Sequence, residues 1–227
     1  GLCGDAAGVA NVKSFGAVGD GVHDDTEAIQ AAIDSLKPAF PGLPATLGGT
    51  VYFPPGYYRI TESIDVISSP SGNFRQNIRL VGSNGGGSGF VGCAIDWDGT
   101  TSDPMLRLWS RDCSVERLAF RVRTGRSTIA AIDVDMSPEN GALAVTNNTF
   151  EHLRIGYQGG GCDGTMTYGV RIGENSPGNV DYMTFRKCYF MHAAEACVGI
   201  TDKTGQAKTI SFYDCGFLSS PYGIKHT

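Results

Sequence analysis

Several features that define large protein classes are missing from this chain of 227 residues. It contains no apolar run near the ~20 residues that a membrane-spanning helix needs, so we expect no membrane partner. Its seven cysteines include no Cys-x-x-Cys pair and no Cys/His cluster at zinc spacing. The formal net charge of −5 argues against a nucleic-acid partner, because proteins that hold nucleic-acid phosphates usually carry a basic face.

Glycine, in contrast, is abundant. The chain has 32 glycines, about twice the usual share of roughly 7 %. This composition suits many tight turns between short strands. The apolar share of 41 % is ordinary and the length fits one domain, so a folded core is expected.

A pattern of seven residues occurs four times in the second half of the chain. The copies begin at Ser114, Thr149, Thr184 and Ser211, at intervals of 35, 35 and 27 residues, with apolar residues at their second, fifth and seventh positions. A second apolar group follows each copy: Ile132 and Val134, Val170 and Ile172, Val198 and Ile200, and Ile224. Short strands that return at a nearly fixed interval are typical of a solenoid, whose units bury their apolar faces against each other. We therefore predict a parallel β-helix.

Two cysteines occupy one step of this repeat. Cys188 and Cys215 stand at the position that Leu118 and Leu153 fill in the earlier copies. One interpretation is a stack of buried thiols, since a free cysteine behaves as a small hydrophobe. The other is a disulfide between neighbouring coils, although inward-facing parallel side chains rarely have the dihedral angle that a disulfide needs. The sequence leaves both open.

An acidic turn precedes a predicted helix near the N-terminus. Residues Thr26 to Leu36 have one apolar face, and Asp24 with Glu27 has the spacing of a capping box. The residues of a type that binds metals in this turn are Asp20, His23, Asp24 and Asp25. A capped turn explains them without a metal, and we expect no metal and no cofactor.

Two stretches carry a specific resemblance. Residues 11–34 read NVKSFGAVGDGVHDDTEAIQAAID, and residues 48–60 read GGTVYFPPGYYRI. The pair resembles the N-terminal signature of the pectate-lyase-3-like superfamily, which includes phage tailspikes, tail appendages and β-helical glycoside hydrolases. The resemblance implies a right-handed parallel β-helix whose N-terminal end is capped by the helix. We accordingly divide the chain into residues 1–77, with the lead-in, capping helix and first strands, and residues 78–227, with the coils.

The resemblance also implies a partner and a place for chemistry. Folds of this group most often bind polysaccharide, and in polygalacturonase-like relatives the catalytic acids follow the repeated strand. By that rule Asp163 and Glu195 are catalytic carboxylates on adjacent coils, and His192 orients or protonates. A carboxylate separation near 5 Å would suit a retaining glycosidase, and one of about 6.5–9.5 Å an inverting one.

Four further residues are candidates for binding a sugar chain. Arg121 and Arg123 are predicted to hold an acidic sugar through bidentate contacts, and Tyr157 and Tyr222 to stack on sugar rings. The alternative is that they form the ordinary outer face of strands and turns. The chain lacks the Asn-Thr-Asp, Gly-His-Gly and Arg-Ile-Lys triplets of polygalacturonases and the Asp-Pro-His of alginate epimerases.

Two functions therefore remain as hypotheses. The first is a polysaccharide hydrolase or lyase that acts outside the cell. The second is a non-catalytic structural or receptor-binding segment of a phage tailspike or adhesin, located on a virion. The strand Tyr222–Thr227 ends the chain without a cap, so we expect further coils of a longer natural chain, or a homotrimer, to cover it.

Overall fold

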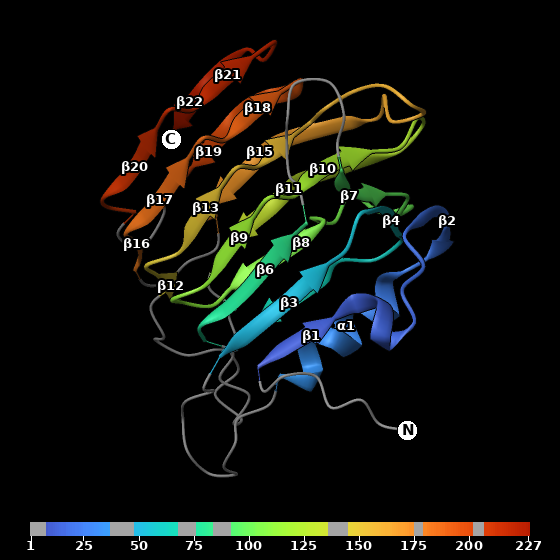
Figure 1. The fold of residues 1–227 in the computed structure, drawn as a ribbon. Coiled ribbons are helices and arrows are strands. Elements are labelled where there is room, and N and C mark those ends of the chain that lie inside the picture. The colour runs from blue at the N-terminus through green and yellow to red at the C-terminus, as the bar shows by residue number, and fades with distance from the viewer. Residues whose placement is uncertain are drawn as a thin grey trace.

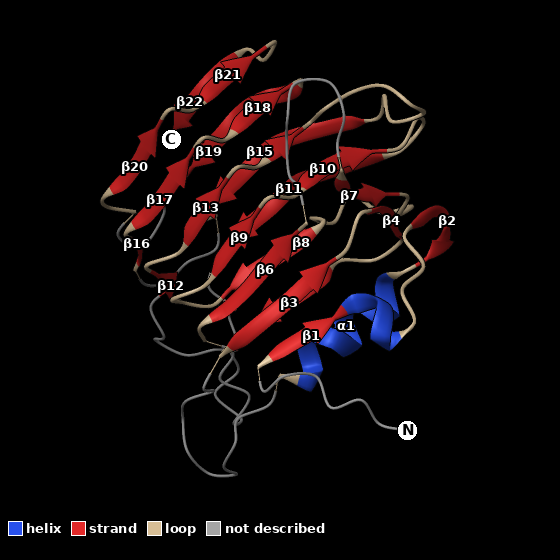
Figure 2. Ribbon diagram, viewed as in Figure 1, coloured by secondary structure: helices blue, strands red, loops and turns tan. Residues whose placement is uncertain are grey.

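The chain forms a right-handed parallel β-helix, as predicted. The computed structural model describes residues 8–36, 48–67, 76–83, 92–135, 145–174, 179–201 and 207–227. The described strands form three long sheets with parallel pairing, and the chain visits the sheets in turn, so that successive coils stack along one axis (Figure 1). Strands dominate the fold, and helix α1 lies at the N-terminal end of the stack (Figure 2).

We name the three sheets A, B and C in the order in which each coil passes through them. Sheet A contains β1 (Val9–Asn11), β3 (Gly49–Phe53), β6 (Ile78–Gly82), β9 (Ser114–Glu116), β13 (Thr149–Glu151), β17 (Met183–Arg186) and β20 (Ile210–Tyr213). Sheet B contains β2 (Asp20–Asp24), β4 (Gly56–Ile60), β7 (Cys93–Trp97), β10 (Ala119–Val122), β14 (Arg154–Ile155), β18 (Tyr189–Met191) and β21 (Gly216–Leu218). Sheet C contains β5 (Ile64–Ile67), β8 (Leu106–Trp109), β11 (Ser127–Val134), β15 (Thr165–Ile172), β19 (Ala193–Ile200) and β22 (Tyr222–His226). A small additional sheet pairs β12 (Val145–Thr146) with β16 (Val180–Asp181). Sheets A, B and C each contain strands from both sides of residue 77, and the division of the chain there stays a prediction.

The four copies of the sequence pattern lie in register inside the solenoid. Val115, Phe150, Phe185 and Phe212 pair across neighbouring strands of sheet A. The ring of Phe185 stacks on those of Phe150 and Phe212, with centroids 4.6 and 4.9 Å apart. The second apolar group forms a matching column on sheet C, made of Ile132, Val170, Val198 and Ile224. Both predicted columns are therefore confirmed.

Each regular coil turns from sheet A to sheet B at one residue in the left-handed conformation. Arg117, His152, Lys187 and Asp214 occupy this corner with φ angles of 53°, 54°, 52° and 53°. The residues that follow directly pack in or against the core: Leu118, Leu153, Cys188 and Cys215. Among the described residues all six cysteines are free thiols, so the two cysteines of the repeat continue the leucine column.

Helix α1 (Thr26–Ser35) caps the solenoid through its apolar face. Ile29, Ala32 and Ile33 are buried in the core, and Leu36 packs against it. A short 3-10 helix, η1 (Val12–Phe15), precedes β2. At ten residues α1 is too short to cross a membrane, and the part of the chain that the structure describes has no helix long and apolar enough to do so.

The acidic turn before α1 differs in detail from the prediction. The residue at the helix start is Asp25 instead of Asp24, and its buried carboxylate accepts hydrogen bonds from the backbone N–H groups of Val18 and Gly19, at 2.7 and 3.1 Å. Asp24 accepts one from the backbone N–H of Thr26 at 3.1 Å. Earlier in the turn, Oδ2 of Asp20 lies 2.7 Å from Nδ1 of His23. Turn formation thus accounts for all four side chains, and no group of three or more metal-binding side chains converges within the described ranges.

Candidate functional site

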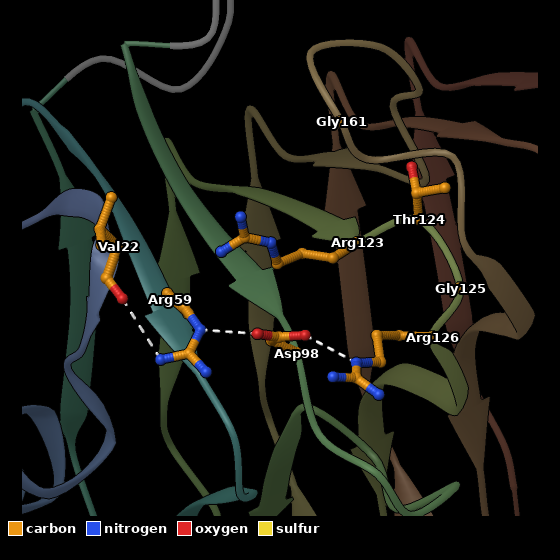
Figure 3. A pocket seen from close by; sticks show the side chains of 8 residues that line it. All are labelled: Val22, Arg59, Asp98, Arg123, Thr124, Gly125, Arg126 and Gly161. Atoms are coloured by element: carbon orange, nitrogen blue, oxygen red, sulfur yellow. Dashed lines mark hydrogen bonds and ion pairs between the residues drawn. The ribbon is translucent and has the colours of Figure 1, made fainter.

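A pocket of about 690 Å³ lies at the corner where strands of sheet B lead into sheet C. Arg59 stands on β4, Asp98 follows β7, Arg123 follows β10, and Arg126 precedes β11. Figure 3 shows the three arginines arranged around Asp98, from neighbouring coils. The remaining lining residues are Val22, Thr124, Gly125 and Gly161.

Strand alternation brings these charged residues to the surface. Tyr58 and Ile60 are buried in the core, so Arg59 between them faces outward. Arg59 is in register with Asp96, and Asp96 with Arg121, which places opposite charges side by side on neighbouring coils. The next outward side chain after Asp96 is Asp98, and the next after Arg121 is Arg123. Both lie at the corner and line the pocket.

Asp98 holds two of the arginines. Its Oδ2 accepts a hydrogen bond from Nε of Arg59 and its Oδ1 one from Nε of Arg126, both at 2.7 Å. Burial alone would raise the pKa of Asp98, but the hydrogen bonds from Arg126 and Arg59 outweigh it, and the pKa lies below its ordinary value. Asp98 is therefore ionised at neutral pH and fixes the orientation of both guanidinium groups.

The arginines also attach the neighbouring segments that frame the pocket. Nη1 of Arg123 donates to the carbonyl oxygen of Gly21 at 2.8 Å, and Nη1 of Arg59 to that of Val22 at 3.3 Å. On the other side, the backbone N–H of Thr124 donates a hydrogen bond of 3.0 Å to the carbonyl oxygen of Gly161, in the loop between β14 and β15. Strand β2 and this loop thereby form two walls of the pocket.

The pocket is positively charged although the chain as a whole is acidic. Three guanidinium groups and one carboxylate line it, whereas the formal net charge of the chain is −5. The side chain of Arg126 is 39 % exposed and so is accessible from solvent. Because a guanidinium group forms paired hydrogen bonds with carboxylates and phosphates, this arrangement is suited to binding an anionic group.

A second pocket of about 270 Å³ adjoins the first, and Arg123 lines both. In it Arg121 donates from Nε and Nη2 to the two carboxylate oxygens of Asp96, at 2.7 and 2.5 Å. Its Cζ lies 4.6 Å from the centroid of the Tyr57 ring. Arg121 is buried and its guanidinium group is directed to Asp96. Of the two arginines predicted to bind a ligand, Arg123 is thus the one that lines the larger pocket.

The two predicted catalytic carboxylates have different partners. Asp163 lies in the loop between β14 and β15, where its Oδ1 accepts a hydrogen bond from the backbone N–H of Gly159 at 3.1 Å. Oε1 of Glu195, on β19, accepts a hydrogen bond of 2.6 Å from Nζ of Lys225. Hydrogen bonds from Lys225 and Tyr168 lower the pKa of Glu195. These contacts do not join the two carboxylates to each other, and their catalytic role stays a prediction.

The other three predicted residues occupy separate places. His192 stands at the corner after β18 with a φ angle of 54°, and its Nδ1 lies 3.2 Å from the carbonyl oxygen of Gly156. Tyr157 packs over two alanines of sheet B. Tyr222 is 53 % exposed on β22. The structure therefore brings Arg121 and Arg123 to the two pockets and Asp163 to the loop beside the larger one, and it places the remaining predicted residues on sheets B and C or at their corners.

Sequence reasoning misses Arg59 and Asp98 as site residues. The repeated pattern marks only the four regular coils, and both residues lie in the irregular coils that precede them. A signal was present, because each residue alternates with core residues in the stretches YYRI and IDWDG. The lengths of the inserts between coils decide which outward residues become neighbours, and those lengths follow no repeat.

The N-terminal part of the chain is similar in sequence to known proteins. A family model described as "Rhamnogalacturonase A/epimerase, pectate lyase-like" matches residues 9–91. The chain is 43 % identical over 88 residues to mannuronan C5-epimerase AlgE2 and, to the same extent, to alginate lyase 7, both of Azotobacter vinelandii. Each match covers 39 % of this chain but only 8 % and 9 % of the two relatives, so the chain spans less than a tenth of their length.

A solved structure extends the likeness through the coils. ORF18 of Geobacillus virus E2 matches with a TM-score of 0.62 and 22 % identity, over 91 % of this chain and 41 % of that chain. At this identity the match concerns the fold alone. The predicted resemblance is confirmed: the chain is a right-handed parallel β-helix with a pectate-lyase-like N-terminal region.

Proposed function

We propose that this chain binds an acidic polysaccharide and is part of a hydrolase or lyase that acts on this polymer outside the cell or on a virion. The observation that carries the proposal is the pocket in which Arg59, Arg123 and Arg126 surround Asp98. A carboxylate-bearing sugar matches this charge, since arginine binds carboxylates through two parallel hydrogen bonds. A neutral sugar offers no such group.

Two further observations support an acidic polymer. The relatives that match the N-terminal region are named for mannuronan and alginate, which are polymers of uronic acids. The residues that line the pocket also come from several neighbouring coils, so a ligand that extends along the stack can contact more than one of them. A polymer therefore suits the site better than a small anion does.

Asp163, Glu195 and His192 remain the proposed catalytic groups. The backbone N–H of Asp163 donates to Oγ1 of Thr124 at 3.3 Å, which ties this residue to the lining of the larger pocket. Glu195 is ionised at neutral pH and accepts a hydrogen bond from Lys225, so as a nucleophile it would have to exchange this partner for the substrate. Asp163 would then be the group closer to a sugar that is held by the arginines.

Binding is tested by titrating the protein with polymannuronate and with a neutral dextran. Arg126→Gln should raise the dissociation constant for polymannuronate about ten- to a hundred-fold, because a hydrogen bond to a charged group contributes about 1.5–3 kcal/mol. Arg79→Gln is the matched control, since Arg79 is an exposed arginine of sheet A that pairs with Glu116. Equal binding of dextran and polymannuronate would contradict the proposal.

Catalysis is tested on the same polymers by the release of reducing ends and by the absorbance at 235 nm of unsaturated products. Asp163→Asn and Glu195→Gln should each abolish turnover while polymannuronate still binds. Turnover that is unchanged in both variants would remove these residues from the mechanism. Absorbance at 235 nm identifies a lyase, and reducing ends without it identify a hydrolase.

A non-catalytic β-helical segment of a tailspike or adhesin is the second proposal. The observation that favours it is that the structure holds Glu195 in an ion pair with Lys225 and gives Asp163 a backbone partner. Binding of polymannuronate without turnover, together with a trimeric mass in light scattering, would support this alternative. A monomer that turns over the polymer would exclude it.

A further inference from the structure

The outer face of sheet B carries three tyrosines, which we call the tyrosine row: Tyr57 on β4, Tyr157 just after β14, and Tyr189 on β18. Tyr57 and Tyr189 are 39 % and 45 % exposed. Ala94 and Ala119 occupy the strands between, in register with Tyr57. Small residues therefore separate the large ones along this face of the solenoid.

The small residues allow the tyrosine rings to lie against the sheet. Tyr157 packs over Ala94 and Ala119. Gly216 pairs with Tyr189, and a Cβ atom at Gly216 would lie 2.9 Å from Cδ1 of that ring. Larger side chains at these three positions would lift the rings away from the strands. The result is a set of tyrosine rings along one face of sheet B, and the apolar face of a sugar ring can stack on rings of this kind.

Arg154 lies near two of the rings of the tyrosine row. The guanidinium group of Arg154 is 5.8 Å from the centroid of Tyr157 and 5.9 Å from that of Tyr189. Within the described ranges no carboxylate pairs with Arg154, and its buried Nε has no hydrogen-bond partner. The buried Nε is out of reach of a ligand, but Arg154 as a whole is only half-buried, so a carboxylate that approaches from solvent can pair with the exposed part of this side chain.

We propose that the tyrosine row is a second binding surface for an acidic polysaccharide, distinct from the arginine pocket. The polymer lies across the coils, its sugar rings stack on the tyrosines, and a carboxylate group of the polymer contacts Arg154. This inference rests on the proposed function, because it assigns the same class of polymer to both surfaces.

The dimensions and the position of the row support a polymer. Tyr57 and Tyr189 are four strands apart in sheet B, a distance of about 19 Å at the usual strand spacing. This length accommodates several sugar units. Tyr57 also lines the smaller pocket together with Arg123, which in turn lines the larger one. A single chain can therefore extend from the arginine pocket along the tyrosine row.

The test compares a long polymannuronate with a mannuronate tetramer in isothermal titration calorimetry. Tyr189→Ala should weaken binding of the long polymer about three- to ten-fold, the range expected for losing one aromatic contact. Binding of the tetramer should change little, because the arginine pocket alone can hold it. Tyr189→Phe keeps the ring and should bind the polymer like the wild type.

Tyr213→Ala is the matched control. Tyr213 is 49 % exposed on sheet A and also carries an arginine over its ring, Arg186 at 4.6 Å, but it lies outside the tyrosine row. Circular dichroism and the melting temperature verify that all variants are folded. Arg154→Gln is a second variant of the row and should weaken polymer binding in the same way.

The outcomes separate this inference from the proposed function. If the wild type binds no polymannuronate, both are overturned. If Arg126→Gln weakens binding but Tyr189→Ala and Arg154→Gln behave like Tyr213→Ala, the arginine pocket stands and the tyrosine row is only a structural surface. Weaker binding of the long polymer in both row variants, with the tetramer unaffected, supports the inference.

Discussion

At the scale of single residues, the ionisation of Asp98 links the pocket to the stability of the fold. In the folded protein the pKa of this carboxyl group is lower than its ordinary value of 3.8, which applies to the unfolded chain. A lowered pKa means that the ionised form stabilises the folded state. This stabilisation is complete above the unfolded pKa and is lost as the pH falls through the folded pKa.

Asp98→Asn removes the charge and should lower the free energy of unfolding by about 1–2 kcal/mol at pH 7, because the side chain is largely buried between Arg59 and Arg126. At about pH 3 the difference from the wild type should shrink, because this pH lies below the unfolded pKa of 3.8 and the unfolded chain then binds the proton that the folded state disfavours. Urea denaturation at the two pH values measures both quantities. Asp103→Asn, at an exposed ion pair, is the control, and an equal loss at both pH values would refute the linkage.

The same scale shows where inference from sequence succeeds and fails. Alternation along the strand correctly places Arg121 and Arg123 on the outer face. It does not identify Asp96 as the partner of Arg121, because these residues are 25 positions apart and belong to different coils. A repeat of fixed length would have predicted the pair, but the coil between β7 and β10 is shorter than those that follow.

At the scale of elements, the corners between sheets fix the course of each coil. Lys187 and Gly156 both have positive φ angles, of 52° and 80°. Most of these corners are occupied by ordinary residues, so glycine and asparagine do not mark them in the sequence. Only the spacing of the inward-facing residues on either side indicates where the corners lie. The sequence therefore predicts the repeat of the coils but not the individual turn residues.

Gly156 is a corner where glycine is required. A Cβ atom there would clash with the carbonyl oxygen of Met191, and the φ angle is positive as well. Gly156→Ala should therefore lower the free energy of unfolding by about 2 kcal/mol or more. Lys187→Gly, at a corner that already tolerates a side chain, should remain within about 1 kcal/mol of the wild type. Urea denaturation compares the two, and a fully stable Gly156→Ala protein would contradict the steric argument.

At the scale of the whole molecule, the site depends on segments that are distant in sequence. Arg123 reaches the carbonyl oxygen of Gly21, which is 102 residues away. The periodic pattern predicts the regular coils, and the resemblance predicts the N-terminal cap. Neither predicts how β2 and β4 stack on β7 and β10, because that arrangement is set by inserts that follow no repeat. The pocket formed at this junction was therefore accessible only from the structure.

Stability should be local along the solenoid, because each coil contacts only its neighbours. Phe185 stacks between Phe150 and Phe212 and is fully buried. Phe185→Ala should cost about 3–5 kcal/mol, the usual loss for a buried phenylalanine. The effect should concentrate in the coils from β13 to β21. Strands β3, β4 and β6, which belong to the first coils, should keep their protection.

Hydrogen exchange of the backbone amides distinguishes this local behaviour from a single cooperative unit. Phe53→Ala is the reciprocal variant, since Phe53 is buried in the first coils and its ring packs edge-on against Tyr58 at 5.5 Å. It should accelerate exchange in β3, β4 and β6 while leaving β17 and β18 protected. Two mirror-image exchange patterns would establish that the coils are energetically coupled only to their neighbours. Uniform acceleration across all three sheets in either variant would show instead that the solenoid unfolds as one unit, and that damage to any coil reaches the arginine pocket.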